Sequence, residues 1–194
     1  LGVLREYQLE QNKLEQEKTN QKNISSIKNL NLAYHPMYLG DSNSSKVIYE
    51  FVDYNCGYCQ KFHQELINVM SDNSIKLVII QMPILGNFSE ELTMLALASS
   101  LQGQFKVVHN YLYSTERKSK MEDILADLFL RGVDLDILKN DLDSQEVSDF
   151  LSIHRSYADE FKFTGTPATI IGNQIIPGFI DADKITEILE KEFS

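Results

Sequence analysis

The sequence predicts an α/β domain preceded by a polar helix, and three observations support this prediction. A β-branched and aromatic run at residues 47–53 leads directly into a Cys-x-x-Cys motif at Cys56 and Cys59. A helical pattern at residues 60–73 and a continuous apolar run at residues 75–81, typical of a buried strand, follow the motif. About 70 residues with helical patterns then precede two short apolar runs near the C-terminus.

The composition is that of a globular protein and excludes several functional classes. The chain has 194 residues, of which 43% are hydrophobic and 24% are charged, and its net charge is −10. Nucleic-acid-binding proteins need a basic face, so we expect no nucleic-acid partner. No apolar run approaches the roughly 20 residues that cross a bilayer. The chain starts at Leu1, and we expect that a signal peptide or membrane anchor has been removed.

Residues 1–31 predict a helix that is almost entirely polar. The stretch LREYQLEQNKLEQEKTNQKN is rich in good helix formers and contains no Gly or Pro. Its apolar residues are sparse, so the helix cannot bury much surface alone. One interpretation is a solvated helix. The other is an oligomerisation stalk, because Tyr7 and Leu14 are one heptad apart, although Gln11 and Lys18 place polar side chains in that seam.

Turn-forming residues separate this helix from the first strand. Residues 33–46 contain Pro36, Gly40 and an Asp-Ser-Asn-Ser-Ser run, which together predict a loop. We therefore divide the chain into an N-terminal stalk with its linker at residues 1–45 and a folded domain at residues 46–194.

A helical block is expected within the folded domain at about residues 88–158. Ser89 is expected to cap its first helix, since an acidic turn follows this residue. Gly103 and Gly132 divide the remainder into short helices.

The C-terminal part predicts a hairpin and a last helix. Residues 168–171 and 174–176 have strand composition, and the Gly-Asn dipeptide between them suits a two-residue hairpin turn. Asp181 is expected to cap a helix that ends at Phe193.

The place of the Cys-x-x-Cys motif indicates redox chemistry. Cys56 lies where a strand ends and a helix begins, and the unpaired N–H groups of a helix N-terminus stabilise a thiolate over a thiol. Cys59 lies one turn later on the same side, but deeper. We therefore expect Cys56 to attack or be attacked, and Cys59 to resolve the mixed disulfide. The redox-active Cys56–Cys59 pair requires no other cofactor.

Two other interpretations of the motif are weaker. A structural disulfide would close so short a ring that it removes little chain entropy. A metal site would use Cys56, Cys59 and His63 with Asp53 as a fourth ligand of Zn²⁺, or the thiolates alone with Cu(I). His63 is more often an exposed helix residue than a ligand, and we expect no bound metal.

The Gly165-Thr166-Pro167 segment predicts a loop that binds substrate. X-Pro bonds are the peptide bonds that adopt the cis form, typically in a tight turn. A cis bond at Pro167 beside the cysteines would present the backbone of Thr166, with which an unfolded protein pairs as an added strand. The alternative is an ordinary turn proline.

Two acidic residues precede the motif. Glu50 lies within the predicted strand, where a carboxylate is costly unless it is paired or functional. Glu50 would exchange a proton with Cys59 through water; otherwise it is a solvated acid at the sheet edge. Asp53 is expected to cap the helix that follows.

These motifs resemble the DsbA-like branch of the thioredoxin superfamily, which comprises bacterial periplasmic disulfide oxidoreductases. The stretches that carry the resemblance are VIYEFVDYNCGYCQKF (47–62), QMPILGNFSEELTMLALA (81–98), LQGQF (101–105) and FTGTPATIIGNQIIPGFIDADKI (163–185). The resemblance implies a thioredoxin fold with a helical insertion. It also implies that Cys56 is the nucleophile, Cys59 the resolving cysteine and Glu50 the buried acid.

Finer features resemble disulfide isomerases. Gly57-Tyr58 between the cysteines resembles the isomerase DsbC, whereas the oxidase DsbA has Pro-His there. Thr166 before Pro167 is also similar to the isomerases. The polar N-terminal helix is similar to that of ScsC-like proteins, whose N-terminal stalks trimerise them. Gly57, Tyr58, Thr166 and Pro167 are then the expected substrate-binding residues.

The expected function is disulfide isomerisation or reduction by a homo-oligomer, and the likeness to ScsC-like proteins implies a trimer formed through residues 1–31. The expected partners are unfolded or misfolded cysteine-containing proteins and a membrane redox partner that resets the centre. The resemblance implies the periplasm of a Gram-negative bacterium. Two alternatives are a monomeric DsbA-like dithiol oxidase and a module that binds Cu(I) or Zn²⁺ through the cysteines.

Overall fold

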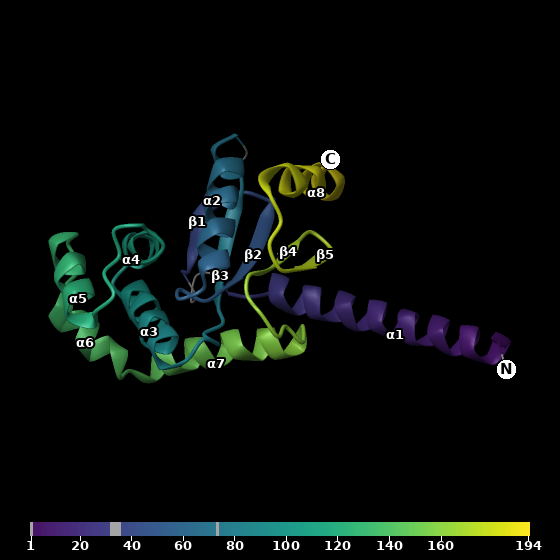
Figure 1. Ribbon diagram of the computed structural model, residues 1–194, viewed down its shortest axis with the longest axis horizontal. Helices are drawn as coiled ribbons and strands as arrows, with labels where there is room; N and C mark the ends of the chain where they lie inside the picture. Colours follow the sequence, from purple (N-terminus) through teal and green to yellow (C-terminus); the bar gives the residue numbers. More distant parts are fainter. Residues whose placement is uncertain (1, 32–35, 73) are drawn as a thin grey trace.

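The computed structural model describes residues 2–31, 36–72 and 74–194. Its N-terminal elements are α1 (Gly2–Lys28), β1 (Tyr38–Gly40), β2 (Val47–Val52), α2 (Gly57–Asp72) and β3 (Lys76–Gln81). Its helical block consists of α3 (Asn87–Leu101), α4 (Phe105–Leu112), α5 (Met121–Leu130), α6 (Leu135–Leu142) and α7 (Gln145–Glu160). The chain ends with β4 (Ala168–Ile171), β5 (Gln174–Pro177) and α8 (Ala182–Phe193). Figure 1 shows how these elements are arranged and confirms the predicted α/β class.

The sheet has the strand order β1-β3-β2-β4-β5, which places β2 at its centre. β2 pairs in parallel with β3 and antiparallel with β4, and β4 and β5 form the predicted antiparallel hairpin. Gly172 in its turn has φ 60°, a left-handed conformation that favours glycine. Glu50 lies between Ile79 and Thr169 in neighbouring strands, so the alternative of an acid at the sheet edge is wrong.

The loop predicted at residues 33–46 contains a short strand. β1 pairs antiparallel with β3, and Tyr38 lies opposite Val78. Three residues are too few to show a strand pattern in the sequence, so only the pairing partner identifies them. The part of this prediction that concerns residues 33–35 lies outside the described residues.

Helices cover both faces of the sheet. On one face, Ile48, Val52 and Ile79 pack in a cluster with side chains of α2, α8 and the helical block. On the other face, Phe51 and Ile80 pack in a second cluster with α7 and the end of α1. Side chains alternate between the two faces of a strand, so Glu50 points with Ile48 and Val52 toward α2.

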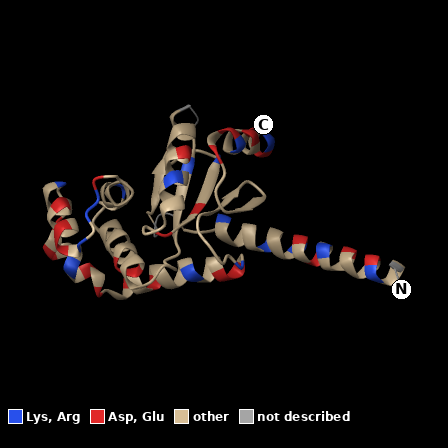
Figure 2. Ribbon diagram, viewed as in Figure 1, with Lys and Arg blue, Asp and Glu red and all other residues tan. Residues whose placement is uncertain are grey.

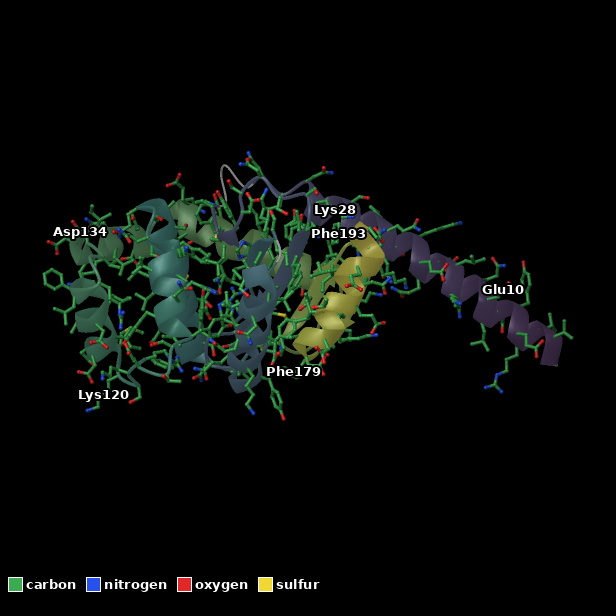
Figure 3. All side chains as sticks on the ribbon, turned by 90° about the horizontal axis from the view of Figure 1, so that it is seen from above. Glu10, Lys28, Lys120, Asp134, Phe179 and Phe193 are labelled. Carbon is green, nitrogen blue, oxygen red and sulfur yellow. The ribbon has the colours of Figure 1, made fainter. Side chains whose placement is uncertain are left out.

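The helix α1 has an exposed part and a buried end. Residues 3–19 are exposed, and in Figures 1 and 2 this part extends away from the rest of the molecule with charges along its length. Ile24 and Ile27, by contrast, are buried against the sheet, and Asn23 Nδ2 donates a 2.6 Å hydrogen bond to the Glu160 carbonyl in α7. The view from above in Figure 3 places Glu10 on the extended part and Lys28 beside the body. The interpretation of a wholly solvated helix is therefore wrong for its last turns.

Two predicted helix caps have different outcomes. Asp181 caps α8, and its side chain accepts a hydrogen bond from the Lys184 amide, as predicted. Ser89 does not cap α3, because that helix begins at Asn87 with Gly86 as its N-cap, and Ser89 lies buried inside it. None of the helices in the described parts of the chain is long and apolar enough to span a membrane.

Candidate active site at Cys56 and Cys59

The two cysteines lie at the start of α2, directly after the central strand. The Cys56 amide donates to the Asp53 carbonyl at 3.0 Å, which turns the chain from strand to helix. The Cys56 carbonyl then accepts from the Gln60 amide at 3.1 Å, so Cys56 occupies the N-cap position. Its Sγ accepts a hydrogen bond from the Cys59 amide at 3.3 Å, and both cysteines are free thiols.

Cys59 is buried more deeply than Cys56, as the sequence predicts. Cys56 is 9% exposed, whereas Cys59 is 0% exposed. Burial raises the pKa of the Cys59 thiol, and hydrogen bonds from the Thr166 side chain and the Asp53 backbone act against this increase. Cys59 therefore requires a proton acceptor before it reacts as a thiolate.

The Thr166–Pro167 segment lies against the cysteines. Its peptide bond is cis, and the Cys56 thiol donates to the Thr166 carbonyl at 3.5 Å. The Pro167 carbonyl accepts from the Gly178 amide at 2.8 Å, which fixes the segment to the end of β5. The structure therefore brings together cysteines and a loop that are 110 residues apart in the sequence.

Asp53 does not cap α2. Its Oδ1 accepts from the Asn55 amide at 2.8 Å, and its Oδ2 accepts from the amides of Ile84 and Leu85 at 2.8 and 3.0 Å. The carboxylate thus fixes the loop before the motif to the loop after β3. The Cys56 sulfur occupies the capping position instead, because it accepts from an amide of the first turn.

Glu50 and His63 form a buried pair beneath the motif. Glu50 is 0% exposed, and its Oε2 lies 3.4 Å from His63 Nδ1. The expectation that His63 is an exposed helix residue is wrong, since 3% of it is exposed. His63 is four residues after Cys59 in α2, which places both side chains on one face of the helix.

The helical block adds aromatic residues that the sequence analysis did not identify. Tyr113, directly after α4, lies with its ring 5.0 Å from that of His63, and its hydroxyl donates to the Asp53 carbonyl at 3.4 Å. His109 in α4 lies 4.7 Å from His63, measured between ring centroids. Burial raises the pKa of Tyr113 well above its ordinary value, and the nearby thiol of Cys59 adds to this effect. No local motif in the sequence marks these residues, because they approach the cysteines only through packing.

The proposed metal ligands are not arranged around a common point. His63 faces Glu50, and the Asp53 carboxylate accepts three backbone hydrogen bonds. Within residues 2–31, 36–72 and 74–194, no group of three or more His, Cys, Asp or Glu side chains is placed to hold a metal ion.

Apolar side chains are exposed around the motif. Tyr58, between the cysteines, is 65% exposed, and Lys61 Nζ lies 5.5 Å from its ring centroid. Ile84 and Leu85, which the Asp53 carboxylate holds, are also exposed. A Cβ added to Gly57 would meet no atom of the described chain within 4 Å, so the space beside Gly57 is open.

Comparisons with known proteins agree with this geometry. A family model described as Thioredoxin matches residues 33–191, which is most of the chain. The Bacillus cereus protein named "Probable disulfide bond formation protein D" is 23% identical over 169 residues, which is 79% of this chain and 77% of that protein.

Solved structures have similar backbones. A thioredoxin-like oxidoreductase from Silicibacter pomeroyi is 26% identical, with a TM-score of 0.74 over 79% of this chain and 90% of that one. The thiol-disulfide exchange protein alpha-DsbA2 from Wolbachia pipientis has a TM-score of 0.80 at 24% identity, over 91% and 97% of the two chains. A Proteus mirabilis ScsC with a linker deletion has a TM-score of 0.76 at 19% identity, over 98% and 92%.

Proposed function

The chain belongs to the thioredoxin family, has a thioredoxin fold and is a thiol–disulfide oxidoreductase of the DsbA/ScsC type, and from this premise we propose that it isomerises and reduces the disulfides of client proteins. The observation that supports this proposal most directly is the pair of unequally exposed thiols at the start of α2. Cys56 keeps a small exposed fraction, 9%, whereas Cys59 has none.

The two thiols have separate roles in the proposed reaction. The Cys56 thiolate attacks one sulfur of a client disulfide, forms a mixed disulfide and releases the other client sulfur as a thiolate. In isomerisation, a second client thiolate attacks the mixed disulfide and returns Cys56 to its thiolate form. In reduction, Cys59 attacks Cys56 instead, so the Cys56–Cys59 disulfide forms and the client leaves reduced. The redox-active pair itself carries the electrons, and no other cofactor is required.

The client binds beside the thiols in this proposal. The Thr166 carbonyl lies 3.5 Å from Cys56 Sγ, so a client strand that pairs with the Thr166 backbone has its sulfur near the nucleophile. Backbone pairing requires no particular client sequence. The exposed side chains of Tyr58, Ile84 and Leu85 add apolar contacts, which suit an unfolded or misfolded protein.

Tyr58 favours isomerisation and reduction over oxidation. A positively charged histidine in the motif stabilises the thiolate form and makes the disulfide a stronger oxidant. Tyr58 is neutral and supplies no such charge. The centre is then less oxidising than that of a Cys-Pro-His-Cys oxidase.

We propose that the working form is a homo-oligomer, specifically a trimer joined through residues 1–31. Val3, Tyr7 and Leu14 are exposed, and at about 100° per residue they lie on one side of α1. Several centres around one client raise the effective concentration of reactive thiols. We place this protein in the periplasm of a Gram-negative bacterium, where a membrane redox partner resets the centre.

Refolding of a scrambled multi-disulfide protein tests the proposed function. The wild-type protein should restore the native client disulfides, and Cys56→Ala should abolish this activity because the attacking sulfur is lost. Cys59→Ala should still form mixed disulfides, since Cys56 remains, and these should accumulate on the client.

Either of two results would contradict the proposal. Rapid oxidation of a reduced client without reshuffling of a scrambled one would identify a dithiol oxidase. Refolding activity that survives Cys56→Ala would remove the motif from the reaction.

A further inference from the structure

A connected set of buried side chains lies between the sheet and α2, below Cys59. Glu50 is contributed by β2 and His63 by α2, and they approach to 3.4 Å. The other carboxylate oxygen of Glu50, Oε1, is buried and has no hydrogen-bond partner among the described residues. Cys59 lies one helical turn before His63, where side chains are about 5–6 Å apart between Cβ atoms. The pair thus lies beside the buried thiol with one carboxylate oxygen available.

The contacts of His109 suit a neutral ring. Gln81 Nε2 donates to the Tyr54 hydroxyl at 3.1 Å, and this hydroxyl lies 2.8 Å from His109 Nδ1. Thr93 Oγ1 donates to Gln81 Oε1 at 3.4 Å. With the hydroxyl proton directed at Nδ1, His109 carries its own proton on Nε2 and is uncharged.

Two further observations agree with a neutral His109. Burial holds the pKa of His109 well below its ordinary value, and the neighbouring His63 lowers it further. Two imidazolium rings 4.7 Å apart in a buried site would repel each other. If one of the two histidines is charged, it is His63, which has a carboxylate beside it.

We propose that His63 is a positioning residue that remains positively charged while the compensating negative charge moves between Glu50 and Cys59. This inference rests on the proposed function, because it concerns the step in which Cys59 resolves the mixed disulfide. A buried carboxylate without a partner is costly, whereas a buried ion pair is tolerated. His63 supplies that partner in both states.

The charges balance through the step. At the start, Glu50 is ionised, His63 is protonated and Cys59 is a thiol, so the net charge is zero. Glu50 accepts the Cys59 proton, directly or through one water, and the Cys59 thiolate then pairs with the same imidazolium. The thiolate attacks Cys56 Sγ, the Cys56–Cys59 bond forms, and the bond from Cys56 to the client breaks. The client sulfur leaves as a thiolate, reduced, and Glu50 then releases the proton to water or to that thiolate, so its carboxylate again pairs with His63.

The ionisable groups of other elements that face the Glu50–His63 pair do not supply the positive charge that we assign to His63. Tyr113, after α4, is held neutral by burial, which raises its pKa. Tyr54, before α2, is likewise neutral, since burial raises its pKa well above its ordinary value. The Asp53 carboxylate accepts from three backbone amides and is directed at the loop after β3.

The resolving step is tested by trapping a mixed disulfide with a model peptide in the full-length protein and following its decay at several pH values. His63→Gln and Glu50→Gln should each slow the decay about 10²–10⁴-fold at pH 7, as expected when a proton acceptor is lost. Their decay rates should increase about tenfold per pH unit, because hydroxide then has to remove the Cys59 proton. The double variant should be no slower than the slower single variant, since the two residues act as a unit.

His154→Gln is the matched control for loss of a buried histidine. His154 lies in α7 and accepts from the Gln81 backbone amide, whereas Glu50 and His63 lie on β2 and α2. In the His154→Gln variant, the decay rate of the mixed disulfide and its pH profile should match those of the wild-type protein. Equal slowing in His154→Gln and His63→Gln, or a wild-type pH profile in His63→Gln, would overturn the inference.

Nuclear magnetic resonance of the wild-type dithiol protein gives a test that needs no variant. The His63 ring should show protons on both nitrogens at pH 7, and the His109 ring should show one on Nε2. A neutral His63 would overturn the inference. If the wild-type protein exchanges disulfides but its His63 variant resolves normally, only this inference fails. If the wild-type protein exchanges none, the proposed function fails as well.

Discussion

At Tyr58, a single side chain decides the charge beside the nucleophile. Tyr58 is exposed and neutral, and the nearby Lys61 ammonium lies 5.5 Å from its ring centroid. The exposure means that the residue contributes little to the core. A substitution here therefore changes the redox centre and leaves the fold intact.

We predict that Tyr58→His makes the centre more oxidising. A protonated histidine stabilises the thiolate of the reduced form, and about 1.4 kcal/mol of such stabilisation corresponds to about 30 mV in reduction potential. Redox titration against glutathione measures this shift, with Tyr58→Phe as the control that leaves the potential unchanged. A wild-type potential as high as that of DsbA, or no shift in Tyr58→His, would show that the dipeptide does not set the redox behaviour.

At the scale of elements, α1 combines two environments in one helix. Its first turns are exposed, whereas Ile24 and Ile27 complete the second core cluster between the sheet and α7. Hydrogen bonds from Asn23 to the Glu160 carbonyl and from Tyr157 to the Ser26 carbonyl strengthen this contact. The exposed part is consequently held at a defined angle to the sheet.

We predict that Ile27→Ala lowers the free energy of unfolding by about 2–5 kcal/mol, because it leaves a cavity in a fully buried site. Leu9→Ala, in the exposed part of the same helix, should change it by less than about 0.5 kcal/mol. Urea denaturation of both variants measures the difference. Equal stability of the two variants would mean that the end of α1 does not pack on the sheet.

At the scale of the whole molecule, the exposed part of α1 bears on the proposed assembly. It extends from the body in Figures 1 and 3, and its apolar side chains have no cover within the described residues. Removal of residues 1–31 would also delete Ile24 and Ile27 from the core. A truncated chain would therefore lose stability together with any assembly, and the two effects could not be separated.

We predict that Tyr7→Lys combined with Leu14→Lys dissociates the oligomer and abolishes isomerisation, while reduction of a simple peptide disulfide persists. The added charges replace the apolar side chains of the proposed seam, but they lie far from the cysteines. Light scattering with the scrambled-client assay measures both effects, and Leu9→Lys on the opposite side of α1 is the control. A monomeric wild-type protein would remove the reason to prefer an isomerase over an oxidase.

The sequence alone determined strands β2 to β5, the redox motif and the order of these elements, because these depend on local patterns. A strand that runs into Cys56 at a helix start is visible in neighbouring residues. The Asp181 cap and the hairpin before it also follow from short-range chemistry. The three-residue strand β1 was missed, because its identity depends on pairing with a distant strand.

The tertiary structure alone decided what surrounds Cys59. His63 was expected to be exposed, yet packing of α4 and the residue after it, Tyr113, against α2 buries it beside Glu50. Asp53 was expected to cap a helix, yet it binds the amides of a loop 31 residues away. Burial and partners at long range are not encoded in a local pattern. They set the charge of each group, and so the chemistry of the buried thiol was decided by the folded structure.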